Sequence, residues 1–100
     1  MNDYILFMHD DAAVNAGADS DAQWARYLAM LRASGRFMGG SAIGSGRCFA
    51  KAPPPKEITS HLSGYLRIQA ESLDEAERLL QGNPVFESGG TVEIRELPRD

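Results

Sequence analysis

The chain has 100 residues, of which 43% are hydrophobic and 24% are charged, and its formal net charge is −4 at pH 7. This composition is typical of a soluble globular domain and excludes a disordered tail, a coiled-coil rod and a collagen-like repeat. Unbroken apolar runs such as Ile5–Met8 are far too short to cross a bilayer, and the acidic balance argues against nucleic-acid binding. A single cysteine excludes an internal disulfide framework, and the first residues lack a signal-peptide pattern. We therefore expect one cytoplasmic domain over residues 1–100, with neither a membrane nor a nucleic acid as partner.

The first part of the chain predicts a strand followed by a helix. Residues 3–9 are mostly apolar, β-branched or aromatic at both odd and even positions, which is typical of an interior strand. The polar, glycine-containing stretch 12–19 predicts a loop. Apolar residues then recur at helical spacing over 21–34, and Gly35 offers the left-handed exit that often ends a helix.

The middle of the chain is rich in glycine and proline. Residues 36–43 predict a second strand, in which the glycine pair 39–40 indicates a bulge or a close approach of another backbone. A turn over 44–46 predicts a hairpin that returns through 47–51 as a short edge strand. The proline run 53–55 cannot donate ladder hydrogen bonds, so we expect it to be an exposed, extended connector.

The last third repeats the pattern of strand, helix and strand. Residues 64–70 alternate between apolar and polar and predict a strand. A capping box from Ser72 to Glu75 predicts a short helix that ends at Gly82, and 91–97 predict the final strand. Two β-α-β halves in this length favour a ferredoxin-like α+β sandwich with both helices on one face of the sheet.

The opposite face of such a sheet has no helix to cover it, although the first strand carries large apolar residues on both faces. The open face would therefore expose an apolar patch, which soluble monomers rarely tolerate. Its candidate members are Ile5 or Tyr4, Phe7 or Met8, and Tyr65. A two-fold contact uses one patch twice, so we expect a homodimer of the dimeric α/β-barrel type, formed through the open sheet face. The alternative is that loops, above all the proline run, fold back over the patch.

His9, followed by Asp10 and Asp11, is the candidate for acid–base chemistry, because a histidine beside carboxylates can act as a general base. The same three residues make a poor metal site, since adjacent side chains point apart and no second histidine stands at ligand spacing. We expect neither a metal nor another cofactor. His61 is a weak candidate for the base of a catalytic triad, because the sequence shows neither a nucleophile-elbow motif nor an acidic third member. Cys48 fits a packing role.

Three stretches suggest a relationship to a known family: YILFMHDD, LRASGRFMGGSAIG and GYLRIQAESLDEAERLLQGNPVFESGGTVEIRELP. Through them nearly the whole chain resembles the YciI-like (YCII-related, DGPF-related) family of small bacterial proteins. The resemblance implies a dimeric ferredoxin-like α+β fold. In the enzymatic branch it also implies a histidine early in the first helix and an aspartate before the proline that follows the second helix. Trp24 and Asn83 stand at these two positions, so the acid–base pair of that branch is absent.

Trp24 and Asn83 still suit recognition by stacking and by amide hydrogen bonds. The expected function is therefore the binding of a small, aromatic or anionic molecule in a cleft between helix and sheet, in an accessory or regulatory role. The residues expected around this cleft are His9, Trp24, Ser41 and Asn83. The first alternative is a lyase or isomerase acting on a small cyclic substrate, with His9 as base oriented by Asp10 or Asp11. The second alternative is a structural protein-interaction module that uses the proline connector, and the sequence leaves open whether the protein is an enzyme.

Overall fold

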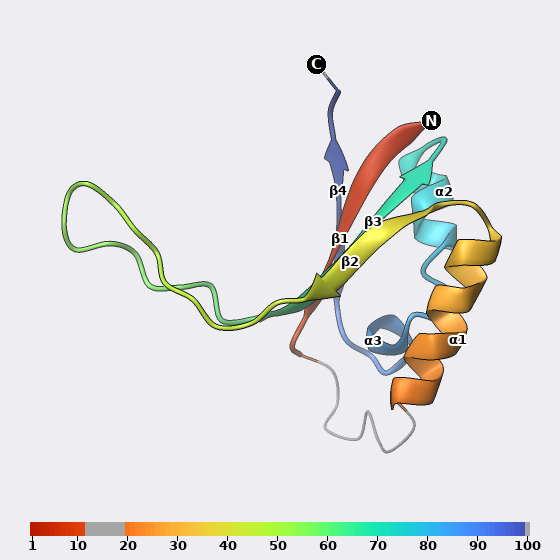
Figure 1. The fold of residues 1–100 in the computed structure, drawn as a ribbon, viewed down its shortest axis with the longest axis horizontal. Coiled ribbons are helices and arrows are strands. Elements are labelled where there is room, and N and C mark those ends of the chain that lie inside the picture. The colour runs from red at the N-terminus through yellow and green to blue at the C-terminus, as the bar shows by residue number, and fades with distance from the viewer. Residues whose placement is uncertain (12–19, 100) are drawn as a thin grey trace.

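The computed structural model describes residues 1–11 and 20–99 and shows a four-stranded antiparallel sheet with helices on one side (Figure 1). The strands are β1 (Asn2–His9), β2 (Phe37–Ala42), β3 (Leu62–Ala70) and β4 (Val92–Leu97). The helices are α1 (Ser20–Ala33), α2 (Leu73–Arg78) and α3 (Pro84–Glu87). The strand order β2-β3-β1-β4 is that of a ferredoxin-like sandwich, so the predicted fold class is confirmed. The loop expected over 12–19 lies outside the described residues.

β1 is an interior strand, as its apolar residues on both faces predict. It pairs antiparallel with β3 on one side and with β4 on the other. Tyr4 and Met8 are buried on the helix side of the sheet, whereas Ile5 and Phe7 are half-buried on the other side. The sequence left open whether Ile5 or Tyr4, and whether Phe7 or Met8, lies on the open face. Ile5 and Phe7 are the residues found there.

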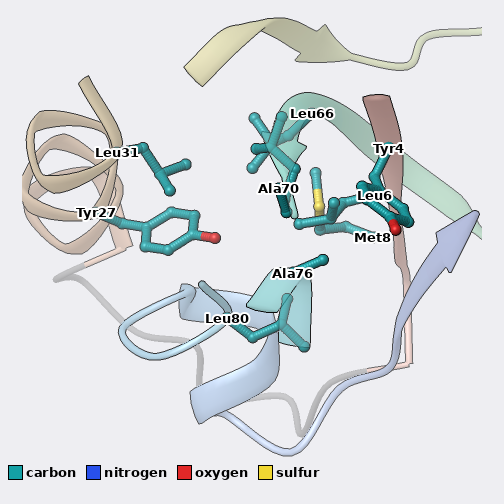
Figure 2. Close-up of a cluster of buried hydrophobic side chains, with 10 residues drawn as sticks. Tyr4, Leu6, Met8, Tyr27, Leu31, Leu66, Ala70, Ala76 and Leu80 are labelled. Atoms are coloured by element: carbon teal, nitrogen blue, oxygen red, sulfur yellow. The ribbon is translucent and has the colours of Figure 1, made fainter. Parts of the chain in front are cut away.

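The hydrophobic core fills the layer between the sheet and the helices (Figure 2). Leu6 of β1 and Leu31 of α1 have no solvent exposure, and burying each side chain stabilises the fold by about 1.5–3 kcal/mol. The remaining buried members are Tyr4, Met8, Tyr27, Leu66, Ile68, Ala70, Ala76 and Leu80. No helix within the described ranges combines the length and the apolar character that crossing a bilayer requires.

The second half of the chain contains one helix more than the sequence predicted. α2 begins as expected, with the Ser72 hydroxyl accepting a hydrogen bond from the Glu75 amide at 3.2 Å. A proline just after a predicted helix end indicates a stop, yet Pro84 is the first residue of α3. Proline is well suited to that position, where its missing N–H would have no partner in the helix. Asn83 caps α3 by accepting hydrogen bonds from the Val85 and Phe86 amides at 3.0 and 3.1 Å.

The glycine pair in β2 behaves as its position predicts. The pairing with β3 shifts register between Phe37 and Gly39, and Gly39 has a φ of 116°. A Cβ on Gly40 would lie 2.5 Å from the Tyr65 carbonyl oxygen. Both glycines are therefore needed to lay β2 against β3.

The connection between β2 and β3, residues 43–61, is called the arm here. It extends from the end of β2 away from the three helices (Figure 1). The expected edge strand over 47–51 is wrong, because this segment leaves the sheet and has no neighbouring strand with which to pair. The exposed proline run over 53–55 is confirmed. Since residues 49–61 are all exposed, the arm does not fold back over the open face of the sheet.

Candidate functional site

A cavity of about 520 Å³ lies between α1 and the β2–β3 edge of the sheet. α1 contributes Trp24, Leu28 and Arg32, which are spaced four residues apart and therefore share one face of the helix. The other lining residues are Met8, Phe37, Gly39, Gly40, Ser41, Ala42, Ser63, Gly64, Tyr65, Leu66 and Val85. The two glycines of β2 contribute only main-chain atoms to the wall of the cavity.

The cavity wall is mainly apolar and aromatic, with a single cation. Trp24 is half-buried and meets the ring of Tyr27 edge to face, at 5.9 Å between centroids and 70° between planes. The Arg32 guanidinium carbon lies 5.4 Å from the centroid of the Phe37 ring, in cation–π contact. A flat ring carrying a negative charge would therefore find both an aromatic wall and a counter-charge here.

The described lining of this cavity contains no His, Cys, Asp or Glu side chain. Such groups carry most proton transfers near neutral pH. The polar and aromatic groups that this lining offers are instead Trp24, Phe37, Tyr65, Arg32 and two serines.

Two of the four residues expected around the cleft, Trp24 and Ser41, line this cavity, and the other two lie elsewhere. Asn83 is fully buried, and its side-chain oxygen is used to cap α3. Its Nδ2 atom has no hydrogen-bond partner among the described residues. His9 follows the parity of Ile5 and Phe7 and lies at the end of the open sheet face. The sequence pattern did not indicate that Arg32 lines the cavity, because an arginine in an amphipathic helix usually belongs to the solvated face of the helix.

His9 takes part in a second polar site, at the end of β1. Its Nε2 atom lies 3.0 Å from Oε1 of Glu93 on β4, and the His61 ring packs against its ring at 4.8 Å between centroids. The hydrogen bond from His9, together with one from Arg95, holds the pKa of Glu93 below its usual value. A histidine with an adjacent carboxylate is the arrangement that fixes and activates a general base.

The carboxylate beside His9 is thus Glu93, where the sequence suggested Asp10 or Asp11. Asp11 instead accepts hydrogen bonds from the amide and the hydroxyl of Thr91, at 2.8 and 2.7 Å. These bonds hold the pKa of Asp11 below its usual value. No spacing signal could reveal Glu93, which stands 84 residues away from His9, although both residues lie at strand ends that the topology makes neighbours.

Neither site brings together a metal-binding set. Over residues 1–11 and 20–99, no three His, Cys, Asp or Glu side chains lie close enough to hold one ion. Cys48 lies on the arm, where its Sγ atom is 3.5 Å from the Glu57 carbonyl oxygen.

The strand order and the cavity beside α1 define a small ferredoxin-like α+β protein with a cleft of ligand size. The family model of the YCII-related domain matches residues 1–99. The chain therefore belongs to the YCII-related family, as its sequence pattern suggested.

One solved structure similar to this chain is 5-chloro-2-hydroxyhydroquinone dehydrochlorinase from Burkholderia phenoliruptrix AC1100, in complex with 2,5-dihydroxybenzoquinone. The two chains are 18% identical and superpose with a TM-score of 0.60, over 98% of this chain and 95% of the other. At this identity the likeness shows a shared fold. No curated protein matches the sequence.

Proposed function

We propose that this protein binds a small anionic aromatic molecule in the cavity between α1 and β2, as a small bacterial cytoplasmic homodimer with an accessory or regulatory role. The observation that carries the proposal is the juxtaposition of Trp24, Phe37 and Arg32 around a cavity of about 520 Å³. That volume falls within the range of roughly 300–1,000 Å³ typical of small-molecule sites.

The ligand class follows from the groups on the wall. Aromatic side chains favour stacking on a planar ring, and a guanidinium favours an anionic oxygen. The 2,5-dihydroxybenzoquinone bound in the similar dehydrochlorinase is not itself aromatic, but it is a compact planar ring whose acidic hydroxyl groups can carry the negative charge. It is a suitable first probe for this chain.

The experiment uses the only tryptophan of the sequence, Trp24, as an internal reporter. Titration with 2,5-dihydroxybenzoquinone is expected to quench the Trp24 fluorescence in a saturable way, with calorimetry as an independent readout. Arg32→Gln is expected to weaken binding by about tenfold, since a hydrogen bond to a charged group contributes roughly 1.5–3 kcal/mol. Arg26→Gln, an exposed arginine of α1 that is outside the lining, serves as the control and should bind like the wild type. Equal affinity in both variants would remove Arg32 from the site.

The second candidate function is a lyase or isomerase with His9 as general base. The pairing of His9 with Glu93 at 3.0 Å favours it, and the dehydrochlorination in the name of the similar structure supports an elimination reaction. The test is chloride release from 5-chloro-2-hydroxyhydroquinone as a function of pH. His9→Ala is expected to abolish the release, and Glu93→Gln to slow it, because the carboxylate that orients the His9 ring is then lost. Undiminished release by His9→Ala would exclude His9 from the chemistry.

The homodimer is proposed to form through the open sheet face. Ile5, Phe7 and Tyr65 are half-buried there, and no element among the described residues covers them. Arg67 and Glu93 give the same face both signs of charge, which suits a surface that must complement itself. Sedimentation at low micromolar concentration is expected to return twice the chain mass, and the mass of one chain would contradict this assembly.

A further inference from the structure

The arm is the part of the described chain that packs least against the rest. Phe49 is 83% exposed and Ile58 is 45% exposed, and of the residues from 44 to 61 only Cys48 is half-buried. The Arg47 guanidinium lies over the Phe49 ring at 5.6 Å. An isolated aromatic side chain at the surface needs no explanation, but an entire segment that presents apolar and cationic groups away from its own body indicates a contact surface.

The charge of the arm is opposite to that of the body. The arm contains Arg47, Lys51 and Lys56 and the single acid Glu57, a net charge of +2 within a chain of net charge −4. The rest of the chain therefore carries −6. Within the described part of the chain, none of the three cations of the arm forms an ion pair. A second copy of this chain thus offers the arm a surface of complementary charge.

The direction and length of the arm fit a second copy on the open side of the sheet. The arm extends away from the helices (Figure 1). About nine extended residues in each direction reach roughly 30 Å, whereas the strands of two stacked sheets lie only about 10 Å apart. The arm is therefore long enough to pass the sheet of a copy that packs against the open face.

In such a dimer, the direction of the two-fold axis determines which residues of the two copies meet. We consider first an axis that is parallel to the strands. It places the β2 edge of one copy opposite the β4 edge of the other, with the same ends of the strands together. Asp10, Asp11 and Glu93 lie at that end, next to the base of the arm, where the Asp10 amide donates to the His61 carbonyl at 2.6 Å. Two-fold axes perpendicular to the strands would instead bring the arm to the end where β2 begins, beside Arg36, which is already paired with Glu75 at 2.8 Å.

We infer that the arm of each copy clasps the other copy, with its cations against the carboxylates of Asp10, Asp11 and Glu93 and with Phe49 buried in the contact. This inference rests on the proposed dimer through the open sheet face and is independent of the proposed ligand. It assigns the arm to recognition of a second copy of this chain.

The first test uses a photoreactive benzoylphenylalanine in place of Phe49. Protein carrying it is mixed with an excess of unsubstituted, ¹⁵N-labelled chains and irradiated, and the cross-linked peptides are identified by mass spectrometry. Cross-links from the light arm to heavy peptides around residues 10–11 or 93 are expected. Cross-links confined to light chains, or none at all, would overturn the clasp. Sedimentation of the same sample shows whether the sheet-face dimer survives such a result or falls with it.

The second test measures the dissociation constant of the dimer. Lys51→Glu combined with Lys56→Glu is expected to raise it at least tenfold at low salt and to reduce its dependence on salt, because these charges would then repel the acidic body. Arg26→Glu combined with Arg78→Glu makes the same change of charge on exposed helix positions and should have a much smaller effect. Equal effects of the two double variants would overturn the inference, since net charge alone would then explain the loss.

Discussion

The Tyr27 hydroxyl on α1 donates a hydrogen bond of 2.8 Å to the main-chain carbonyl oxygen of Leu79, the residue that follows α2. This bond joins α1 to the end of α2. Tyr27→Phe keeps the ring in the core but leaves the carbonyl group without its partner. We expect the free energy of unfolding to fall by about 1–3 kcal/mol, measured by urea denaturation. An unchanged denaturation midpoint would show that water replaces the hydroxyl at no cost.

The same residue predicts a loss of stability in alkaline solution. Burial raises the pKa of Tyr27 above its ordinary value of 10.0. The folded protein therefore keeps a proton that the unfolded chain releases, so the contribution of Tyr27 is complete below pH 10 and is lost as the pH rises through the raised folded value. Urea denaturation between pH 9 and about pH 11 should show a steeper loss for the wild type than for Tyr27→Phe. Parallel pH profiles would contradict the assignment to this hydroxyl.

Gly40 predicts a steric effect in β2. A Cβ at this position would lie 2.5 Å from the Tyr65 carbonyl oxygen and 2.7 Å from Leu66 Cδ2, so β2 would have to move away from β3. We expect Gly40→Ala to destabilise the protein by about 1–3 kcal/mol. It should also alter ligand binding, because Gly40, Tyr65 and Leu66 all line the cavity. Gly44→Ala is the matched control, since nothing lies within 4 Å of its added methyl group. Thermal unfolding compares the two variants, and similar midpoints would refute the close approach.

Asn83 predicts a capping effect at α3. Its side-chain oxygen accepts the hydrogen bonds of the Val85 and Phe86 amides, and loss of an N-cap costs about 0.5–2 kcal/mol. We expect Asn83→Ala to lose at least that much, because the residue is also fully buried. Asn83→Ser, which retains a capping oxygen, should be less destabilised than the alanine variant when the two are compared by urea denaturation. The reverse order would argue that packing volume matters more than the cap.

Asp11 predicts a sensitivity to acid. The hydrogen bonds from Thr91 hold the pKa of Asp11 below its ordinary value of 3.8. A lowered folded pKa contributes stability that is present above pH 3.8 and is lost as the pH falls through the lowered value. Asp11→Asn should therefore show a shallower loss of stability in acid than the wild type. The measurement is urea denaturation from about pH 6 down to about pH 2, and identical slopes would contradict the prediction.

Local signals were sufficient to predict the four strands of the sheet and the helices α1 and α2. The alternation of 64–70, the cap at Ser72 and the glycine pair 39–40 each describe a short-range constraint that the structure retains. The signal at Pro84 was ambiguous, because proline both stops one helix and starts another. The expected strand at 47–51 failed because a strand needs a partner, and whether a partner lies alongside is a property of the whole sheet.

The candidate site was predicted only in part, for a related reason. Trp24 was assigned to a cleft through the family resemblance, and it lines the cavity together with Ser41. The partnership of His9 and Glu93 depends on the pairing of β1 with β4 at the two ends of the chain, and the role of Arg32 depends on how α1 is rotated over the sheet. Neither is encoded in a spacing along the sequence.

The base of the arm has a consequence for the connectivity of the fold. The Ile43 amide donates to the Ser63 carbonyl at 3.1 Å, so the contact between the two chain segments extends to the first residue of the arm. At the far end of the sheet, Asp3 pairs with Leu97 and binds Arg99 through its carboxylate, which places residues 3 and 99 beside each other. A permuted version of this sequence, in which a short linker joins residues 1 and 99 and the chain is opened within the arm, should therefore reach the same sandwich.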